Sequence, residues 1–469
     1  MRFIGRRRLP RNQFRTAKPF LEWLEGRALF SLTPVAFAPP VNYTSGGNEI
    51  MAATADLNGD GKLDLVTAND LTNSVSVLLG NGDGTFAPHV DYAAGPRTYG
   101  IALGDLNGDG HPDIVASNAD GNSVSVLLNN GNGTFGAKTD FGLGLRPNYE
   151  IALGDLNGDG HLDLVTASVN AHVISVMLGN GSGAFGGPSL IPTPGRPDVV
   201  TLGDLNGDGR LDIVTGGTDA GVVSVFLGNG NGTFGTATNY PVPGFTSYLA
   251  LGDLNHDGHL DLVTTNNYAN TVTVFLGVGN GTFGSGTDYA GGNTTYGVAL
   301  ADLNGDGNLD IAASNTGSAN VSILLGNGDG TFAPHTDFTA APNSAIVTAG
   351  DFNGDGLPDL LTANSLGGTV TVLLNQTVVS PQQQTANLIN QVTALVTSAT
   401  LTQTQAGALN AKLQAAVQQL SKGNATAAIN QLQAFINQTN AYIQTKKISI
   451  AVGTSLIDTA NGIIQLLTT

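Results

Sequence analysis

The amino-acid sequence predicts a mainly β protein: a seven-bladed β-propeller with four-stranded blades, followed by a small all-α helical bundle. An acidic pattern, Asp-Leu-Asn-Gly-Asp-Gly-x-x-Asp in its commonest form, recurs seven times at intervals of 49 or 50 residues. Each interval holds four short strand-like runs, which is typical of one propeller blade. Residues 378–469 instead carry apolar residues at helical spacing, which predicts helices there.

Residues 1–36 are predicted to be a targeting or anchoring segment outside the fold. Residues 1–27 hold eight of the 18 basic residues, but the apolar stretch that follows is broken by Ser31, Thr33 and Pro34, unlike that of a conventional signal peptide. Residues 21–31, LEWLEGRALFS, resemble a motif near the start of planctomycete-type extracellular proteins. That resemblance implies secretion or surface attachment, and a disordered basic tail is the alternative.

The repeat runs through residues 37–377, and each unit is expected to start with an outer strand. A Phe with a second aromatic residue six positions later marks this strand at 37/43, 86/92, 135/141, 234/240, 283/289 and 332/338, whereas Phe185 is followed by Ile191. An inner strand such as 100–104, the acidic loop, a second strand such as 113–117 and a third such as 123–128 follow. The chain leaves the repeat at Asn375, so the first outer strand is expected to complete the last blade and close the ring.

Each acidic loop predicts a cation site. Loop positions 1, 3, 5 and 9 carry oxygen side chains and position 6 is Gly, and a hard divalent cation such as Ca²⁺ prefers six to eight oxygen ligands. Two carboxylates about 4 Å apart repel by roughly 4 kcal/mol at an effective dielectric near 20, so a bound cation would relieve the loop. An acidic surface turn would explain one copy but not seven, and an EF-hand needs an acidic residue at position 12, where Thr or Ala stands here.

The sequence therefore predicts about seven bound Ca²⁺ ions. The predicted ligands are Asp56, Asn58, Asp60, Asp64, Asp105, Asn107, Asp109, Asp113, Asp155, Asn157, Asp159, Asp163, Asp204, Asn206, Asp208, Asp212, Asp253, Asn255, Asp257, Asp261, Asp302, Asn304, Asp306, Asp310, Asp351, Asn353, Asp355 and Asp359.

The pattern DLNGDGxxDLV followed by LLGNGDGTF is similar to the FG-GAP/VCBS repeat family, the calcium-binding propeller repeats that also build the heads of integrin α-subunits. The resemblance implies that the loops lie on a lower face, that the backbone carbonyl of position 7 is a further ligand, and that partners meet the upper face. His256 stands at position 4 of the fifth loop, where the other loops have Gly.

Composition narrows the function classes. The formal net charge is -18, and most of the acidic residues belong to the loops, which argues against a nucleic-acid partner. The sequence has no Cys, so disulfides, thiol catalysis and cysteine zinc sites are excluded. Millimolar calcium outside cells would fill even weak loops, which favours a secreted or cell-surface protein. No apolar run is long enough for a transmembrane helix.

A non-repeating set of residues predicts a ligand face opposite the loops. These residues lie on connections at the other end of the strands: Arg97, Tyr99, Arg146, Tyr149, Arg196, Tyr248, Tyr268 and Tyr296. They are expected to form an aromatic and cationic rim for an extracellular glycan, in particular an anionic polysaccharide, or for a protein. The alternative is that they are turn residues braced against neighbouring blades.

No nucleophile, phosphate-binding or zinc-protease motif is present, so no catalytic residues are assigned. The sequence favours a calcium-stabilised binding or adhesion protein that is not an enzyme. A calcium-dependent, polysaccharide lyase-like enzyme is the alternative, and a structural envelope component is a third hypothesis.

In residues 378–469, Thr402 with Gln405 predicts a capping box and Gly423 a helix stop. The stretch AGALNAKLQAAVQQLSKGNATAAINQLQAFINQ resembles the helical FIMAH-type module of secreted bacterial proteins.

Overall fold

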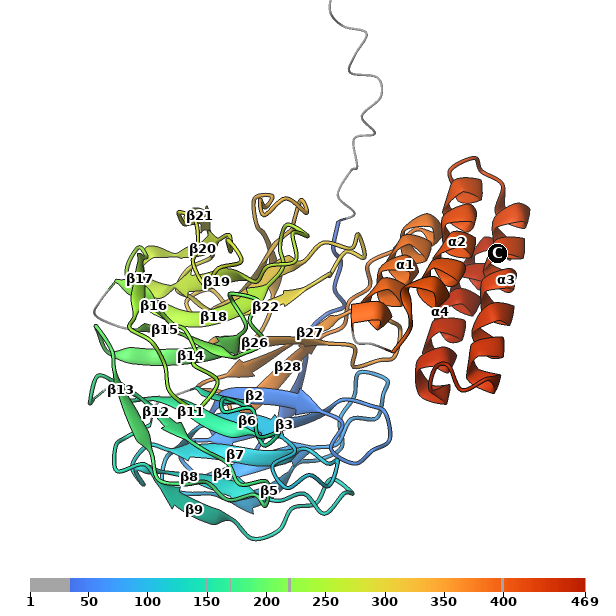
Figure 1. The fold of residues 1–469 in the computed structure, drawn as a ribbon. Coiled ribbons are helices and arrows are strands. Elements are labelled where there is room, and N and C mark those ends of the chain that lie inside the picture. Colours follow the sequence, from blue (N-terminus) through green and yellow to red (C-terminus); the bar gives the residue numbers. More distant parts are fainter. Residues whose placement is uncertain (1–33, 148–149, 169, 218–220, 398–399, 469) are drawn as a thin grey trace, which may run out of the picture. The chain divides into compact units, whose positions relative to one another are not determined.

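The computed structural model describes residues 34–147, 150–168, 170–217, 221–397 and 400–468. Nearly all of the expected targeting segment, including the motif at residues 21–31, lies outside these residues. Twenty-eight strands form seven four-stranded antiparallel sheets, and four helices follow them, which confirms the predicted fold class (Figure 1).

Each sheet is one blade, and in six of the seven blades the four strands follow one another in the chain. The first blade is β2 (Glu49–Ala55), β3 (Asp64–Asn69), β4 (Ser74–Leu78) and β5 (Val90–Ala93), and the second is β6 (Thr98–Gly104), β7 (Asp113–Asn118), β8 (Ser123–Leu127) and β9 (Thr139–Gly142). The third is β10 (Ile151–Gly154), β11 (Asp163–Ser168), β12 (Val173–Met177) and β13 (Ser189–Pro192), and the fourth is β14 (Pro197–Gly203), β15 (Asp212–Gly217), β16 (Val222–Phe226) and β17 (Thr238–Pro241). The fifth is β18 (Thr246–Gly252), β19 (Asp261–Asn266), β20 (Thr271–Phe275) and β21 (Thr287–Ala290), and the sixth is β22 (Thr295–Ala301), β23 (Asp310–Asn315), β24 (Asn320–Leu324) and β25 (Thr336–Thr339). The seventh is β26 (Ser344–Gly350), β27 (Asp359–Asn364), β28 (Thr369–Leu373) and the early strand β1 (Val41–Thr44).

The ring closes as predicted. β1 pairs antiparallel with β28, with Val41 opposite Val372, so the start of the repeat completes the last blade. Each innermost strand contacts the innermost strands of its two neighbours, and β2 contacts both β6 and β26. The innermost strands therefore form a closed ring, in which every strand has a neighbour on each side.

The outer strands are shorter than expected. They begin at residues such as Val41 and Val90, whereas the preceding Phe37 and Phe86 form isolated bridges with Asn375 and Gly80. The Phe therefore belongs to the turn before the strand, and the residues between the two make no ladder pairs in the sheet. The second strands match the expected positions and are buried throughout, as in β7.

Aromatic pairs join neighbouring blades at the outer strands. The second aromatic of one unit packs edge-to-face against the Phe of the next blade, with ring centroids 5.5 Å apart for Tyr43 and Phe86. Such a contact contributes about 0.5–1.5 kcal/mol beyond burial. The pairs are Phe37–Phe338, Tyr43–Phe86, Tyr92–Phe135, Phe141–Phe185, Tyr240–Phe283 and Tyr289–Phe332. At the remaining joint, between the third and fourth blades, Ile191 takes the place of the second aromatic opposite Phe234.

The C-terminal helices are α1 (Pro381–Thr397), α2 (Gln403–Leu420), α3 (Ala425–Gln444) and α4 (Ile450–Thr468). α1 packs against α2 and α4, and α3 packs against α2 and α4, around buried residues such as Leu409, Leu432 and Phe435. The predicted capping box is confirmed, since the Thr402 hydroxyl accepts from the Gln405 N–H and the Gln405 side chain accepts from the Thr402 N–H. Within the described residues, none of the helices is long and apolar enough to cross a membrane.

Candidate cation loops and the opposite face

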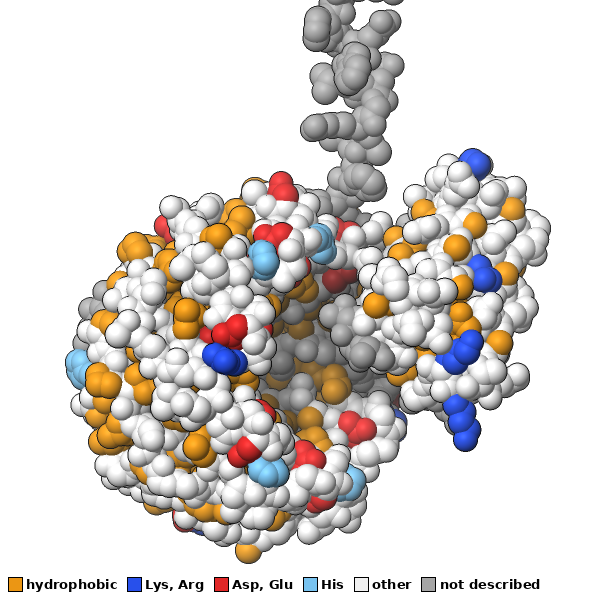
Figure 2. Space-filling view, in the orientation of Figure 1, with side chains coloured by type: hydrophobic (Ala, Val, Ile, Leu, Met, Phe, Trp, Pro, Cys, Tyr) orange, Lys and Arg blue, Asp and Glu red, His pale blue; other side chains and the backbone are white. Residues whose placement is uncertain are grey.

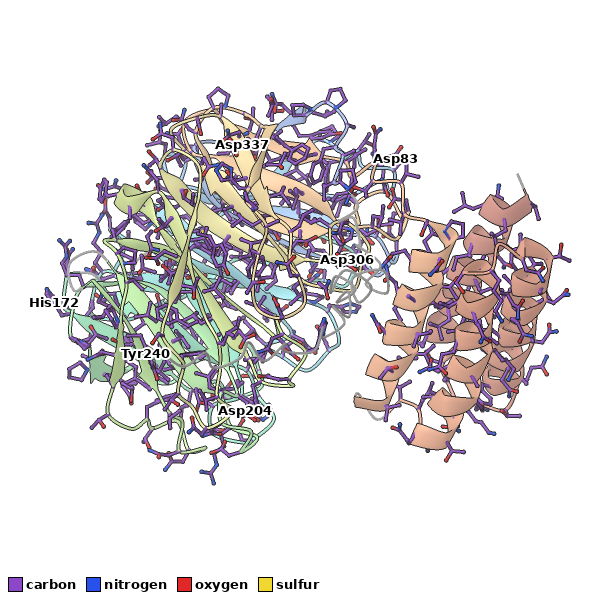
Figure 3. All side chains as sticks on the ribbon, turned by 90° about the horizontal axis from the view of Figure 1, so that it is seen from above. Asp83, His172, Asp204, Tyr240, Asp306 and Asp337 are labelled. Carbon is purple, nitrogen blue, oxygen red and sulfur yellow. The ribbon has the colours of Figure 1, made fainter. Side chains whose placement is uncertain are left out.

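Strand direction places the seven acidic loops on one face of the propeller. In every blade the innermost strand runs directly into the loop and the second strand runs back from it, as β6 and β7 do around residues 105–112. Figure 2 shows several acidic side chains on the propeller, some of them beside a basic or histidine side chain. Within the loops, Lys62 lies 3.6 Å from Asp60 and Arg210 lies 3.8 Å from Asp208. In Figure 3, the loop residues Asp204 and Asp306 lie away from His172, which stands on the hairpin between β11 and β12.

The first carboxylate of each loop organises the loop backbone. In the second blade, Asp105 Oδ1 accepts from the Gly108 N–H at 2.7 Å and Oδ2 accepts from the Gly110 N–H at 2.8 Å. Desolvation acts in the opposite direction, but these backbone donors hold the pKa of Asp105 below its ordinary value. Gly110 has a φ of 85°, a left-handed conformation that favours glycine at position 6.

The last carboxylate of each loop accepts two backbone hydrogen bonds that the sequence did not reveal, and we call it the bracing carboxylate. Asp113 is fully buried, and its oxygens accept from the Leu106 N–H at 3.0 Å and the Asn129 N–H at 2.8 Å. Desolvation, together with repulsion from Asp109 and Asp105, raises the pKa of Asp113. The same pair of bonds recurs at Asp64, Asp163, Asp212, Asp261, Asp310 and Asp359.

The loops are also part of the joints between blades. The carbonyl of Leu57, at position 2 of the first loop, accepts from the Gly133 N–H of the second blade at 3.0 Å and from Asn129 Nδ2 at 2.9 Å. Equivalent bonds from the next blade's glycine reach Leu106, Leu156, Leu205, Leu254 and Phe352. A change in loop conformation therefore acts directly on the contact with the next blade.

The donor chemistry of each loop fits a hard divalent cation. Three carboxylates, one amide oxygen and a backbone carbonyl are the oxygen ligands that Ca²⁺ prefers. Within the described ranges, the carboxylates do not converge as a preformed cluster of three acidic or histidine groups. Their oxygens accept from N–H groups, but each oxygen has two lone pairs and so keeps capacity for an ion once the side chain turns.

On the opposite face, the predicted cationic rim is paired with acidic groups. Arg97 Nε lies 3.2 Å from Asp70 Oδ1, and Arg146 Nη2 lies 3.2 Å from Asp120 Oδ1. Arg97 Nη1 also lies 4.0 Å from Asp120 Oδ2, so the four side chains form a chain across the first three blades. This arrangement neutralises Arg97 and Arg146 locally and weakens the case for an anionic ligand. Arg196 is half-buried on the connection that leads into β14.

The predicted aromatic residues fall into two groups. Tyr99 is buried beneath the Arg97 guanidinium, whose carbon lies 5.1 Å from the ring centroid, and Tyr248 and Tyr296 pack against the hydrophobic core. All three tyrosines lie inside innermost strands (β6, β18 and β22) and not on the connections where the sequence placed them, whereas Tyr149 lies outside the described residues.

Among the described residues of the predicted set, Tyr268 is the exposed one. Its side chain is 85% exposed and packs against Phe245, with ring centroids 5.9 Å apart and planes tilted by 40°. Tyr268 stands on a 3₁₀ turn, Asn267–Ala269, that connects β19 to β20, and the Asn267 N–H donates to the Phe245 carbonyl at 3.0 Å. Sequence reasoning missed Phe245, although its position on the preceding connection of the same face was the available signal.

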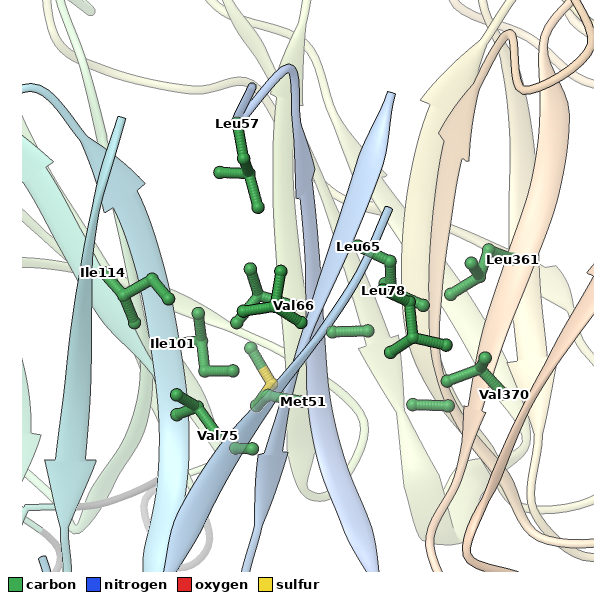
Figure 4. Packing of buried hydrophobic residues seen from close by; sticks show 14 of the residues in the cluster. Met51, Leu57, Leu65, Val66, Val75, Leu78, Ile101, Ile114, Leu361 and Val370 are labelled. Atoms are coloured by element: carbon green, nitrogen blue, oxygen red, sulfur yellow. The ribbon is translucent and has the colours of Figure 1, made fainter. Parts of the chain in front are cut away.

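A buried polar contact also crosses the centre of the ring. Glu150 lies next to β10 of the third blade, and its carboxyl hydrogen-bonds the Tyr248 hydroxyl of the fifth blade and accepts from the Val200 N–H at 3.0 Å. The Tyr248 oxygen lies 3.9 Å from the sulfur of Met51, a first-blade residue in the cluster of Figure 4. Because these blades are not neighbours, the contact spans the propeller axis.

Burial raises the pKa of Glu150 to about 8, so this carboxyl is protonated at neutral pH. Sequence reasoning did not single it out. One signal in the sequence could have revealed Glu150. It is acidic, whereas the equivalent positions of other blades carry apolar residues such as Met51, Val199 and Ile346.

The ring of seven repeated blades, each carrying an acidic loop, defines a repeat β-propeller. Six matches to a model described as an FG-GAP-like repeat, at residues 56–116, 105–166, 155–215, 204–264, 253–313 and 302–362, cover more than half of the chain. The protein therefore belongs to the FG-GAP-like repeat family. Residues 385–465 match the FIMAH domain.

Solved structures with a similar fold are distant in sequence. A lectin from Agrocybe aegerita, described as specifically recognising non-reducing terminal N-acetylglucosamine, is 24% identical with a TM-score of 0.49, over 73% of this chain and 96% of the lectin. BBS1N, solved in complex with ARL6DN, is 13% identical with a TM-score of 0.50, over 72% and 96% of the two chains. At these identities the likeness concerns the fold alone. No curated protein matches the sequence.

Proposed function

We propose that this protein is a calcium-stabilised, non-enzymatic binding protein that acts outside the cell and recognises a glycan on the face opposite its acidic loops. The observation that carries the proposal is the exposed Tyr268 ring, which packs in a tilted arrangement against Phe245. Exposed aromatic rings offer a flat apolar surface with a polar edge, which suits the apolar face of a sugar ring. On the same face, Arg97 and Arg146 are paired with Asp70 and Asp120, so a neutral or weakly charged glycan fits better than a strongly anionic one.

The calcium part of the proposal rests on the loop chemistry. Repulsion from neighbouring carboxylates contributes to the raised pKa of Asp64 and Asp113, although desolvation is the larger cause. Bound Ca²⁺ would supply the positive charge that compensates this repulsion. Loops of modest affinity would fill in millimolar extracellular calcium, which supports an extracellular address.

The non-enzymatic part of the proposal rests on accessibility. The Glu150–Tyr248 contact has the raised pKa expected of a catalytic acid, but Glu150 is only 9% exposed and is tied to backbone. Arg97, which a lyase-like mechanism would need, is paired with Asp70. Neither group is therefore placed to act on a polymer.

Binding to a glycan array in millimolar calcium chloride tests the proposal, with Tyr268→Ala as the disabling variant. Leu71→Ala is the matched control, because Leu71 is 71% exposed on the β3–β4 hairpin of the same face but is not aromatic. We expect Tyr268→Ala to weaken glycan binding by about tenfold or more and Leu71→Ala to leave it unchanged. An array without any bound glycan, or equal binding by both variants, would contradict glycan recognition at this face and leave a protein partner or a structural role.

A further inference from the structure

The joint between the third and fourth blades differs from the others in one residue. At the other six joints an aromatic ring from the outer strand packs edge-to-face on a Phe of the following blade. At this joint, β13 carries Ile191 instead, and among the described residues no such edge-to-face ring contact involves Phe234 of the fourth blade. Phe234 is half-buried, as are Phe37 and Phe185, whereas Phe86, Phe135, Phe283 and Phe332 are at most 8% exposed.

A cavity of about 530 Å³ opens at this joint. Its volume lies in the range of small-molecule sites, which is roughly 300–1,000 Å³. The apolar lining comes from both blades and includes Leu190, Ile191, Pro192, Pro194, Phe226 and Phe234. The missing ring therefore leaves a ready-made apolar pocket rather than a collapsed joint.

The lining also defines the chemistry of a ligand. None of the described lining residues is charged, and the polar side chains at the cavity are the hydroxyls of Ser189, Thr233 and Thr236. A charged ligand would lose hydration without gaining a partner, so a neutral molecule fits. A ring placed where the missing aromatic would stand meets Phe234 in the edge-to-face geometry of the other joints, where centroids are 5.0 Å apart for Phe37 and Phe338 and 5.7 Å for Phe141 and Phe185.

We propose that this joint is a binding pocket for a small neutral molecule that carries an aromatic ring. The pocket lies between β13 and the turn before β17, in different blades from Tyr268, so the proposal stands independently of glycan binding at that residue.

Saturation-transfer NMR on the full chain with three probes tests the ligand class. The probes are p-cresol, which reproduces a tyrosine side chain, cyclohexanol, which has a saturated ring, and methyl β-glucoside, which is a sugar. We expect a signal from p-cresol that clearly exceeds those of the other two. An equal or stronger signal from cyclohexanol or the glucoside would overturn the aromatic assignment.

Three variants locate the site. Ile191→Tyr supplies the missing ring and Thr236→Trp blocks the opening from an exposed position, so each is expected to weaken p-cresol binding by about tenfold or more. Ile191→Val keeps the pocket open and is expected to retain binding. Urea unfolding checks that each variant is folded, and Thr236→Trp carries the test if Ile191→Tyr does not fold. A folded Ile191→Tyr or Thr236→Trp protein that binds p-cresol like the unchanged chain would overturn the proposal.

Discussion

The two faces of the propeller differ in how strictly their residues repeat from blade to blade. On the loop face, the same carboxylates make the same hydrogen bonds in every blade, as Asp113 and Asp212 do with two backbone N–H groups each. On the opposite face, the equivalent connections carry different residues, such as Arg97 in one blade and Phe245 in another. Repetition therefore maintains the scaffold, while departures from the repeat distinguish one blade from another and provide the candidates for recognition.

The largest expected effect comes from removing a bracing carboxylate on the loop face. Asp212→Ala leaves the buried N–H groups of Leu205 and Gly228 without their partner, at about 1–3 kcal/mol each. We expect the free energy of unfolding in EDTA to fall by roughly 2–5 kcal/mol, measured with urea. Asp208→Ala, in the same loop but exposed, is the control and is expected to cost much less. An equal loss of unfolding free energy in the two variants would mean that the buried hydrogen bonds of the position 9 carboxylate do not stabilise the fold more than the exposed carboxylate does.

The next effect concerns the contact across the ring axis and its dependence on pH. The pKa of Glu150 is raised from 4.5 to about 8, so between these values the folded chain holds a proton that the unfolded chain has released. This contribution to stability is complete below pH about 4.5 and is lost as pH rises through about 8.

Glu150→Gln keeps an acceptor for the Val200 N–H but cannot ionise. Its stability relative to the unchanged chain should therefore rise with pH, by on the order of a few kcal/mol between pH 5 and 8. Urea unfolding at several pH values in constant calcium measures this difference. A difference that stays constant across the range would show that Glu150 titrates normally.

A smaller effect is expected from the paired arginines of the opposite face. Arg97→Ala removes an exposed ion pair with Asp120 and a half-buried one with Asp70, which together are expected to contribute about 1 kcal/mol. Arg97 has a φ of 61°, so Arg97→Gly removes the same pairs and also relieves backbone strain. We expect Arg97→Gly to be at least as stable as Arg97→Ala in urea unfolding, and the reverse order would show that relief of the positive φ does not outweigh the extra freedom that glycine gains in the unfolded chain.

Much of the fold could be predicted because it depends on local, repeated signals. The spacing of the acidic loops gave the number of blades, and the early strand without a partner of its own predicted the closure that β1 and β28 make. The predicted extent of the outer strands was wrong. An aromatic pattern such as Phe86 to Tyr92 reflects contacts between blades as well as strand pairing within one blade.

The functional residues were less predictable because their roles depend on distant neighbours. The ligand-type spacing of Asp113 does not reveal that two backbone N–H groups, one of them 16 residues away, use its oxygens. The pairing of Arg146 with Asp120 and the contact of Glu150 with Tyr248 join different connections or different blades, and the repeat alone does not specify either. Ile191 was visible as a break in the aromatic pattern, but the cavity at that joint was not.

Metal counting by mass spectrometry, combined with thermal unfolding in calcium and in EDTA, tests the central claim most directly. We expect about seven calcium ions per chain and, since each filled site adds about 2.7 kcal/mol when calcium is 100-fold above its Kd, a melting temperature lower by roughly 10 °C or more in EDTA. A chain that carries no calcium and melts at the same temperature in both conditions would contradict the account.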